Sequence, residues 1–181
     1  MTTQLAATAD SGDRPPLTVR LARNADGILE QIAKEYGVST LEVVRSLPKD
    51  QRTLAPAAQF EAVMMDVSLW GEIMFIVHTP DIVLECAGPL PPGTFARGYF
   101  NLHGDSPIGG HIPADRCQTI AFVARPFMGR PSRSIQFFNT AGEAMFKIFV
   151  RRDEKRELIA DQVAKFDALR ERCRGMARGH N

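Results

Sequence analysis

Two histidines in the middle of the chain have residue types around them that could bind a flat or metal-containing ligand. His78 ends an apolar run, and His111 directly follows Gly109 and Gly110. A neutral imidazole is a common ligand of iron and zinc. Two glycines remove side chains beside His111 and let a flat ligand approach the backbone closely. The alternative for each histidine is a hydrogen-bonded structural role, which is commoner for an isolated histidine in a strand.

The charge of the chain is balanced overall but unevenly distributed along it. Lys and Arg number 22 against 21 Asp and Glu, a net charge of +1, which argues against a protein that coats a polyanion. Residues 53–96 hold five acids and no Lys or Arg, whereas residues 97–133 hold five arginines and no lysine. Because the arginine fork suits carboxylate or phosphate, we expect an anionic ligand. The five arginines are Arg97, Arg116, Arg125, Arg130 and Arg133.

The segment 125–133, R-P-F-M-G-R-P-S-R, is predicted to be a loop that exposes Phe127 and Met128 between arginines. An aromatic ring and a thioether flanked by cations could cover an apolar macrocycle and pair with its acidic edge. The alternative is a hydrophobic loop that docks on a sheet.

The elements that must position these residues follow one another as helices, strands and a helix. Residues 27–66 are predicted to be helical, residues 70–150 to form short antiparallel strands, and residues 155–174 to form an amphipathic helix. This order favours an α+β fold over alternating βαβ units. Residues 1–24 are expected to be disordered or poorly ordered, because they are polar and small. Residues 25–174 then form a single domain.

Several classes of protein find no support in the sequence. The apolar runs are too short to span a bilayer, and the first residues lack the basic and apolar regions of a secretory signal. Three cysteines without a C-x-x-C pair argue against a disulfide framework and a structural zinc site. No phosphate-binding loop, dinucleotide-binding motif or nucleophile elbow occurs. We therefore expect a cytoplasmic protein.

Residues 27–47 have the pattern of a helix-turn-helix, with Gly37–Ser39 as the turn. A recognition helix presents side chains to base edges and phosphates. The second helix here offers Thr40, Glu42, Arg45 and little else, so DNA binding is a minor hypothesis. A helical hairpin that packs on the sheet is the favoured alternative.

Four segments between residues 70 and 158 are characteristic of a known family. They read W-G-E-I-M-F-I-V-H-T-P-D, G-Y-F-N-L-H-G-D-S-P-I-G-G-H-I, I-A-F-V-A-R-P-F-M-G-R-P-S and I-Q-F-F-N-T-A-G-E-A-M-F-K-I-F-V-R-R-D-E-K-R-E-L. They resemble the HutX/ChuX family of cytosolic haem-utilisation proteins. The likeness runs from about Ala25 to Leu169 and is most specific between residues 98 and 158.

This resemblance implies an α+β fold in which N-terminal helices and a C-terminal helix flank a large saddle-like antiparallel sheet, as in HemS, ChuS and ChuX. It implies a cytoplasmic homodimer that binds haem b and passes it to a haem-degrading partner. Neither nucleic acid nor membrane is expected as a partner. A haem-degrading oxygenase is the main alternative to a carrier.

The resemblance also indicates site residues. It implicates His78 and His111 as iron ligands, His103 as a second-line histidine, and Tyr99 because some members use a tyrosine. Haem presents an apolar face, an iron that accepts imidazole or phenolate, and two propionates that pair with arginine. A carrier must release its haem, which suits one exchangeable axial ligand better than a closed bis-histidine cage. The remaining expected contacts are Met128 and, for the propionates, at least one of Arg97, Arg116, Arg125 and Arg130.

Overall fold

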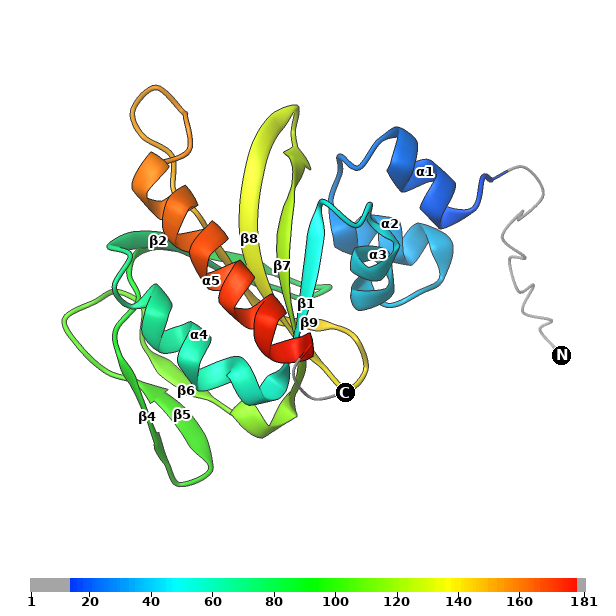
Figure 1. Ribbon diagram of the computed structural model, residues 1–181. Helices are drawn as coiled ribbons and strands as arrows, with labels where there is room; N and C mark the ends of the chain where they lie inside the picture. The colour runs from blue at the N-terminus through cyan, green and yellow to red at the C-terminus, as the bar shows by residue number, and fades with distance from the viewer. Residues whose placement is uncertain (1–13, 179–181) are drawn as a thin grey trace, which may run out of the picture.

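A computed structural model describes residues 14–178 of the chain (Figure 1). Within this range the helices are α1 (Leu17–Arg23), α2 (Leu29–Tyr36), α3 (Thr40–Ser46), α4 (Phe60–Val67) and α5 (Ala160–Arg178), with short 3-10 turns η1 (Ala57–Gln59) and η2 (Ala114–Arg116). The strands are β1 (Arg52–Pro56), β2 (Glu72–His78), β3 (Val83–Pro89), β4 (Gly93–Ala96), β5 (Tyr99–Leu102), β6 (Gly110–Ile112), β7 (Cys117–Phe127), β8 (Arg130–Asn139) and β9 (Ala144–Phe149).

The strands form two antiparallel sheets. The larger has the order β1-β7-β8-β9-β2-β3, and the smaller has the order β4-β5-β6. The predicted hairpins are present, because β2 pairs with β3 and β8 pairs with β9. Helices lie on both faces of the larger sheet rather than alternating with its strands (Figure 1). The predicted α+β class is therefore confirmed.

One face of the larger sheet is covered by α4 and α5, which lie side by side in Figure 1. Phe60 of α4 lies at the centre of this core, with its ring 5.4 Å from the rings of both Phe100 and Phe137. Phe166 of α5 is fully buried and packs 5.6 Å from Phe122. This core joins the two sheets, because Phe100 belongs to the smaller one.

The other face is covered near β1 and β7 by the N-terminal helices. Gly37 ends α2 in a left-handed conformation, and the Ser39 hydroxyl accepts a hydrogen bond from the Glu42 N–H at 3.2 Å. The apolar faces of α2 and α3 pack against Ala121, Val123 and Phe138 of the sheet. The helical hairpin therefore covers the sheet, as the alternative to a DNA-binding role predicts.

The N-terminal part of the chain has more regular structure than the sequence predicts. Helix α1 lies in the stretch that was expected to be poorly ordered, and its Leu21 is 1% exposed in the core beneath α2 and α3. Burial of this leucine stabilises α1, although the composition of residues 1–24 is unfavourable for ordered structure. Residues 1–13 of that stretch lie outside the described residues. Strand β1 interrupts the predicted helical region 27–66, because its backbone pairs with β7.

The C-terminal helix begins and ends later than predicted. Residues 152–158 form a turn closed by a bridge between Arg152 and Leu158, so α5 starts at Ala160 rather than at residue 155. It then continues to Arg178, past residue 174. No helix in the described part of the chain is long and apolar enough to cross a membrane.

The segment 125–133 is not a loop, which corrects the sequence prediction. Strands β7 and β8 continue through it and pair as far as Phe127 and Arg130. A two-residue turn joins them, with φ of 52° at Met128 and 72° at Gly129. Such turns match the twist of a hairpin. The Asp26 carboxylate holds the turn by accepting hydrogen bonds from both turn N–H groups, at 2.8 and 2.7 Å.

Candidate ligand-binding sites

Two cavities lie on opposite faces of strand β2. Cavity A, of about 490 Å³, is lined by Met74, Ile76 and His78, whereas cavity B, of about 670 Å³, is lined by Phe75 and Val77. Alternate residues of a strand point to opposite faces, so β2 forms part of the wall between the cavities. Both volumes fall within the range of about 300–1,000 Å³ that small-molecule sites occupy.

Cavity B is mainly apolar and has a histidine and an arginine in its wall. Its apolar lining comes from β2, β3, β9 and the segment around Ile108. Gly109 and Gly110 lie beside His111 in this wall, and Arg116 of η2 adds a cation. An apolar ligand that carries an acidic group would fit this combination.

The tautomer of His111 is fixed by Asn101. The Asn101 side-chain Nδ2 donates to the carbonyl oxygens of Thr94, Ala96 and Tyr99 at 3.0–3.1 Å. Its Oδ1 therefore faces the other way and lies 2.6 Å from Nδ1 of His111. Because Oδ1 can only accept, Nδ1 of His111 carries the proton. With the proton on Nδ1, the lone pair of a neutral imidazole lies on Nε2, and this is the tautomer that can ligate iron through Nε2.

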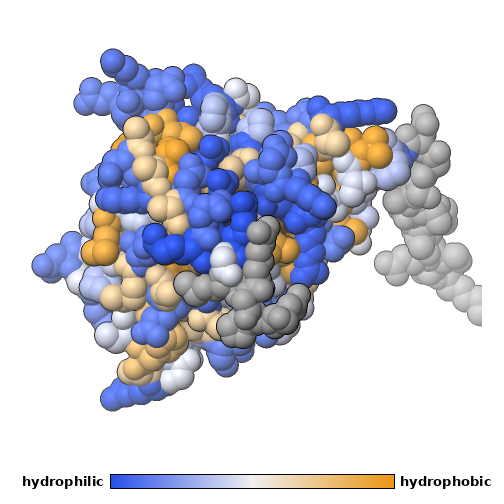
Figure 2. All heavy atoms as spheres, viewed as in Figure 1, coloured by the Kyte–Doolittle hydropathy of each residue, from blue (hydrophilic) through white to orange (hydrophobic). Residues whose placement is uncertain are grey.

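Two further aromatic groups lie beside His111. The ring of Tyr99 is 6.0 Å away and that of His103 is 5.9 Å away, between ring centroids. We call Tyr99, His103 and His111 the His111 cluster. Figure 2 shows apolar side chains gathered near the β4–β5 hairpin, where Phe95 and Tyr99 are about half exposed. The structure thus brings three predicted residues together at an accessible edge of the protein.

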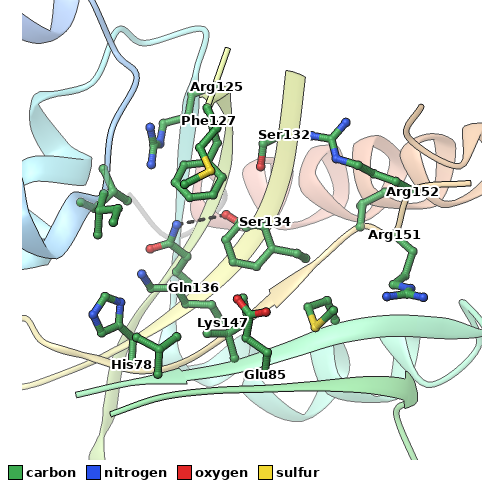
Figure 3. A pocket seen from close by; sticks show the side chains of 18 of the residues that line it. His78, Glu85, Arg125, Phe127, Ser132, Ser134, Gln136, Lys147, Arg151 and Arg152 are labelled. Atoms are coloured by element: carbon green, nitrogen blue, oxygen red, sulfur yellow. Dashed lines mark hydrogen bonds between the residues drawn. The ribbon is translucent and has the colours of Figure 1, made fainter. Parts of the chain in front are cut away.

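Cavity A has a polar end built from residues far apart in the chain. Glu30 of α2 pairs with the Lys147 ammonium, and its second oxygen lies 3.3 Å from Nδ1 of His78. Burial lowers the pKa of Lys147, and the Glu30 carboxylate opposes that shift. Gln136 lies next to Lys147, and its Nε2 donates to the Ser134 hydroxyl (Figure 3).

Arg125 and Met128 also line cavity A, but the Arg125 side chain has a structural role. Its guanidinium donates to the carbonyl oxygens of Ala25 and Gly27, both at 2.6 Å, and fixes the loop between α1 and α2. Burial lowers the pKa of Arg125, while the carboxylates of Asp26 and Glu30 oppose this effect. Met128, by contrast, is 75% exposed at the hairpin tip.

The predicted site residues therefore separate into three groups. His78, Arg125 and Met128 line cavity A, whereas His111 and Arg116 line cavity B with Tyr99 and His103 close by. His78 and His111 are not brought together. Arg97, with φ of 54° in the β4–β5 turn, and Arg130, at the start of β8, are exposed and lie outside both linings.

Sequence reasoning missed Asn101, Glu30, Gln136 and Lys147. The last two are polar residues that interrupt apolar strands, and both are nearly fully buried. That interruption was the available signal. No sequence pattern pointed to Glu30, because it reaches Lys147 from a helix 117 positions earlier in the chain. Among residues 14–178, no group of three or more His, Cys, Asp and Glu side chains could hold a metal ion.

Fold and cavities together define a class of α+β proteins in which helices cover an antiparallel sheet and a cavity lies on each face of its strand β2. The chain belongs to the family described as haem utilisation ChuX/HutX, whose family model matches residues 53–169. It is 36% identical over 141 residues to the intracellular heme transport protein HutX of Vibrio cholerae, covering 77% of this chain and 73% of HutX.

Solved structures share the fold. The heme binding protein ChuX is 43% identical, with a TM-score of 0.80 over 86% of this chain and 97% of ChuX. The heme degrading enzyme ChuS of Escherichia coli O157:H7 is 15% identical, with a TM-score of 0.71 over 87% of this chain and 49% of ChuS. The likeness to ChuS concerns the fold alone. These matches confirm the resemblance and the fold that the sequence implies.

Proposed function

We propose that this chain is a cytoplasmic haem carrier that binds haem b through His111 and passes it to a haem-degrading partner. The observation that carries the proposal is the fixed tautomer of His111 beside the apolar cavity B. The names of the relatives agree with it, because HutX is an intracellular heme transport protein and ChuX a heme binding protein.

His111 suits a carrier better than His78 does. No hydrogen bond within residues 14–178 occupies its Nε2, its residue is exposed, and Tyr99 and His103 lie close enough to take part in loading or release. His78 instead has its Nδ1 against Glu30, a carboxylate already paired with Lys147. An exposed and exchangeable iron ligand allows the haem to leave, whereas an enclosed ligand retains it.

The wall of cavity B supplies the remaining contacts for haem. Apolar residues of β2, β3 and β9 receive the macrocycle, and Arg116 is the cation in the lining that can pair with a propionate. Gly109 and Gly110 leave space beside the ligand-bearing residue. We assign the propionate contact to Arg116 rather than to Arg97 or Arg130, which lie outside the cavity.

We further propose that the carrier is a homodimer. Strand β3 is at the edge of the larger sheet, and Ile82, just before it, and Val83 and Leu84, at its start, are 52–57% exposed. An unpaired, apolar edge strand is a surface that proteins normally cover. Light scattering should therefore give a dimer for the wild type and a monomer for Ile82→Lys. A wild-type monomer would contradict the dimer without affecting the haem site.

A haemin titration followed by absorbance tests the haem site. The wild type should give a saturable Soret shift, and His111→Ala should weaken or displace it. His78→Ala is the matched control and should bind like the wild type. An unchanged titration with His111→Ala, or no specific shift with the wild type, would refute the assignment. With ascorbate added, a carrier should keep its Soret band, whereas conversion to a biliverdin-like product would indicate an oxygenase.

A further inference from the structure

Two exposed histidines lie next to each other on the smaller sheet. His111 of β6 is the cross-strand partner of Asn101 in β5, and His103 lies two positions beyond Asn101, directly after that strand (Figure 1). Diagonal neighbours on adjacent strands are within reach of one another when their side chains are long. The two imidazole rings accordingly lie 5.9 Å apart between centroids, at an angle of 70°. Because both residues are exposed, ions from the solvent can reach the pair.

The spacing of the two rings is close to that of a chelate around one metal ion. Imidazole nitrogens bind Zn²⁺ at about 2.0–2.1 Å in a tetrahedral arrangement, which places the centroids of two bound rings roughly 5 Å apart. The observed separation is slightly wider, and a small rotation of one ring would close it. His103 can make that rotation, because within residues 14–178 its ring has no hydrogen bond and contacts only the His111 ring.

His111 is already held in the form that binds a metal. Its Nδ1 lies 2.6 Å from Oδ1 of Asn101, and the Asn101 amide is anchored by three backbone carbonyl oxygens. Metal-binding histidines commonly have such an acceptor on the second ring nitrogen, which orients the ring. One histidine is thus fixed and the other can adjust, an arrangement that suits a reversibly bound cation.

The residue types select the class of cation. Imidazole favours divalent transition-metal ions such as Zn²⁺, Ni²⁺ and Cu²⁺, whereas Mg²⁺ and Ca²⁺ prefer oxygen ligands. No group of three or more His, Cys, Asp and Glu side chains surrounds the pair among residues 14–178, so water completes the coordination. Tyr99 also contacts His111, at 6.0 Å between centroids, but a phenol binds a metal only after it loses a proton. The imidazole pair is therefore the chelating unit.

We propose that His103 and His111 form a binding site for a divalent transition-metal ion in the haem-free protein. Nε2 of His111 and one ring nitrogen of His103 bind the ion, and Asn101 is a positioning residue that orients His111. The site shares His111 with the proposed haem site, so the exclusion of haem by the bound cation rests on that proposed function. Cation binding to the haem-free protein does not depend on it.

Histidine ring NMR and calorimetry with Zn²⁺ test the site in the haem-free protein. Zn²⁺ should shift the ring signals of His103 and His111 together, while that of His78 stays in place. His103→Ala should weaken Zn²⁺ binding about tenfold or more, because the second ligand of a chelate acts at a high effective concentration. His180→Ala, which also removes one imidazole, is the matched control and should bind like the wild type. Equal losses in both variants, or a shift of His111 without His103, would overturn the proposal.

Competition with haemin separates the cation site from the haem site. Zn²⁺ should weaken haemin binding to the wild type, and His103→Ala should remove this effect at the same Zn²⁺ concentration, because haemin needs only His111. Competition that persists unchanged in His103→Ala would contradict the chelate. Haemin binding that Zn²⁺ leaves unchanged, while both ring signals still shift, would refute haem ligation by His111 and support the cation site. Zn²⁺ that shifts neither ring while haemin still binds would overturn the cation site alone.

Discussion

Asn101 holds His111 in one tautomer from the strand beside it. The two residues are direct cross-strand partners of β5 and β6, with Oδ1 and Nδ1 2.6 Å apart. The asparagine is itself oriented by three carbonyl oxygens of the β4–β5 hairpin, so it cannot turn to offer its amide hydrogens. A hydrogen bond to the non-ligating ring nitrogen orients a histidine and raises its basicity as a ligand.

Replacing Asn101 should weaken haem binding through His111. Asn101→Leu removes the acceptor, and we expect a loss of about 10- to 100-fold in haemin affinity, the usual effect of deleting such a partner. Nitrogen NMR of the haem-free protein should show one dominant His111 tautomer in the wild type and a mixture in the variant. A single tautomer in both proteins would contradict the positioning role, whatever the haemin titration gives.

Arg116 should strengthen haemin binding by pairing with a propionate carboxylate of the haem. We expect Arg116→Gln to weaken haemin binding about tenfold, and to have little effect on binding of the haem dimethyl ester, which lacks the charges. Arg97→Gln and Arg130→Gln serve as controls because both arginines lie outside the cavity linings. An equal loss in the control variants would point to general electrostatic attraction rather than to a contact in cavity B.

The three cysteines should differ in reactivity. Cys86 is partly exposed in the wall of cavity B, whereas Cys117 and Cys173 are buried. Burial raises the pKa of Cys117 to about 11 and raises that of Cys173 as well. Since the thiolate is the reactive form, iodoacetamide at about pH 8 should label Cys86 first.

Haemin should protect Cys86 from this labelling if the macrocycle occupies cavity B. Mass spectrometry of the labelled peptides gives the rate for each cysteine. His111→Ala protein at the same haemin concentration should lose most of the protection. Labelling of Cys86 at the same rate with and without bound haemin would place the haem elsewhere.

Asp26 should make the protein sensitive to acid. The N–H of Gly129 has the largest effect and lowers the pKa of Asp26. Burial raises this pKa, but the hydrogen bonds from Gly27 and Met128 and the charge of Arg125 lower it further, so the net shift is downward. Because the folded-state pKa lies below the ordinary value, the stabilisation is complete above the pKa of the unfolded carboxyl, about 4, and is lost as the pH falls below it.

Asp26→Asn should therefore lower the free energy of unfolding at pH 7 by about 1 kcal/mol, the contribution of a typical hydrogen bond. The difference from the wild type should shrink as the pH falls from about 5 to about 3. Urea unfolding at several pH values measures it, with Asp115→Asn on the exposed turn η2 as the control. A difference that stays constant with pH would show that the carboxylate charge is not involved.

Much of the fold is predictable from local patterns. The β2–β3 and β8–β9 hairpins follow from apolar runs separated by turn residues, and Ser39 and Gly37 mark the boundaries of α3 and α2. Strand β1 and the continuous β7–β8 hairpin were missed for a different reason. Both depend on pairing with a partner strand, which overrides the proline and glycine content of the local sequence.

The site is predictable only in part. Histidine and arginine can be selected from a sequence by their chemistry. Two residues selected in this way, His111 and Arg116, both line cavity B in the structure. The sequence could not show that His78 faces the other cavity, because the face depends on how the whole sheet is covered. Asn101 was missed because its importance lies in three backbone contacts and one ring nitrogen, none of which residue type reveals.

The order of strands in the larger sheet bears on how the chain folds. β7, β8 and β9 are neighbours in both sequence and space, whereas β1 pairs with β7 and β2 pairs with β9 only after long segments of chain have been brought together. Closing a long loop costs more entropy than closing a short one. We therefore expect the β7–β8–β9 meander to form early and the outer strands to join it later. Both cavities would then be completed late in folding, because each needs β2 and β3.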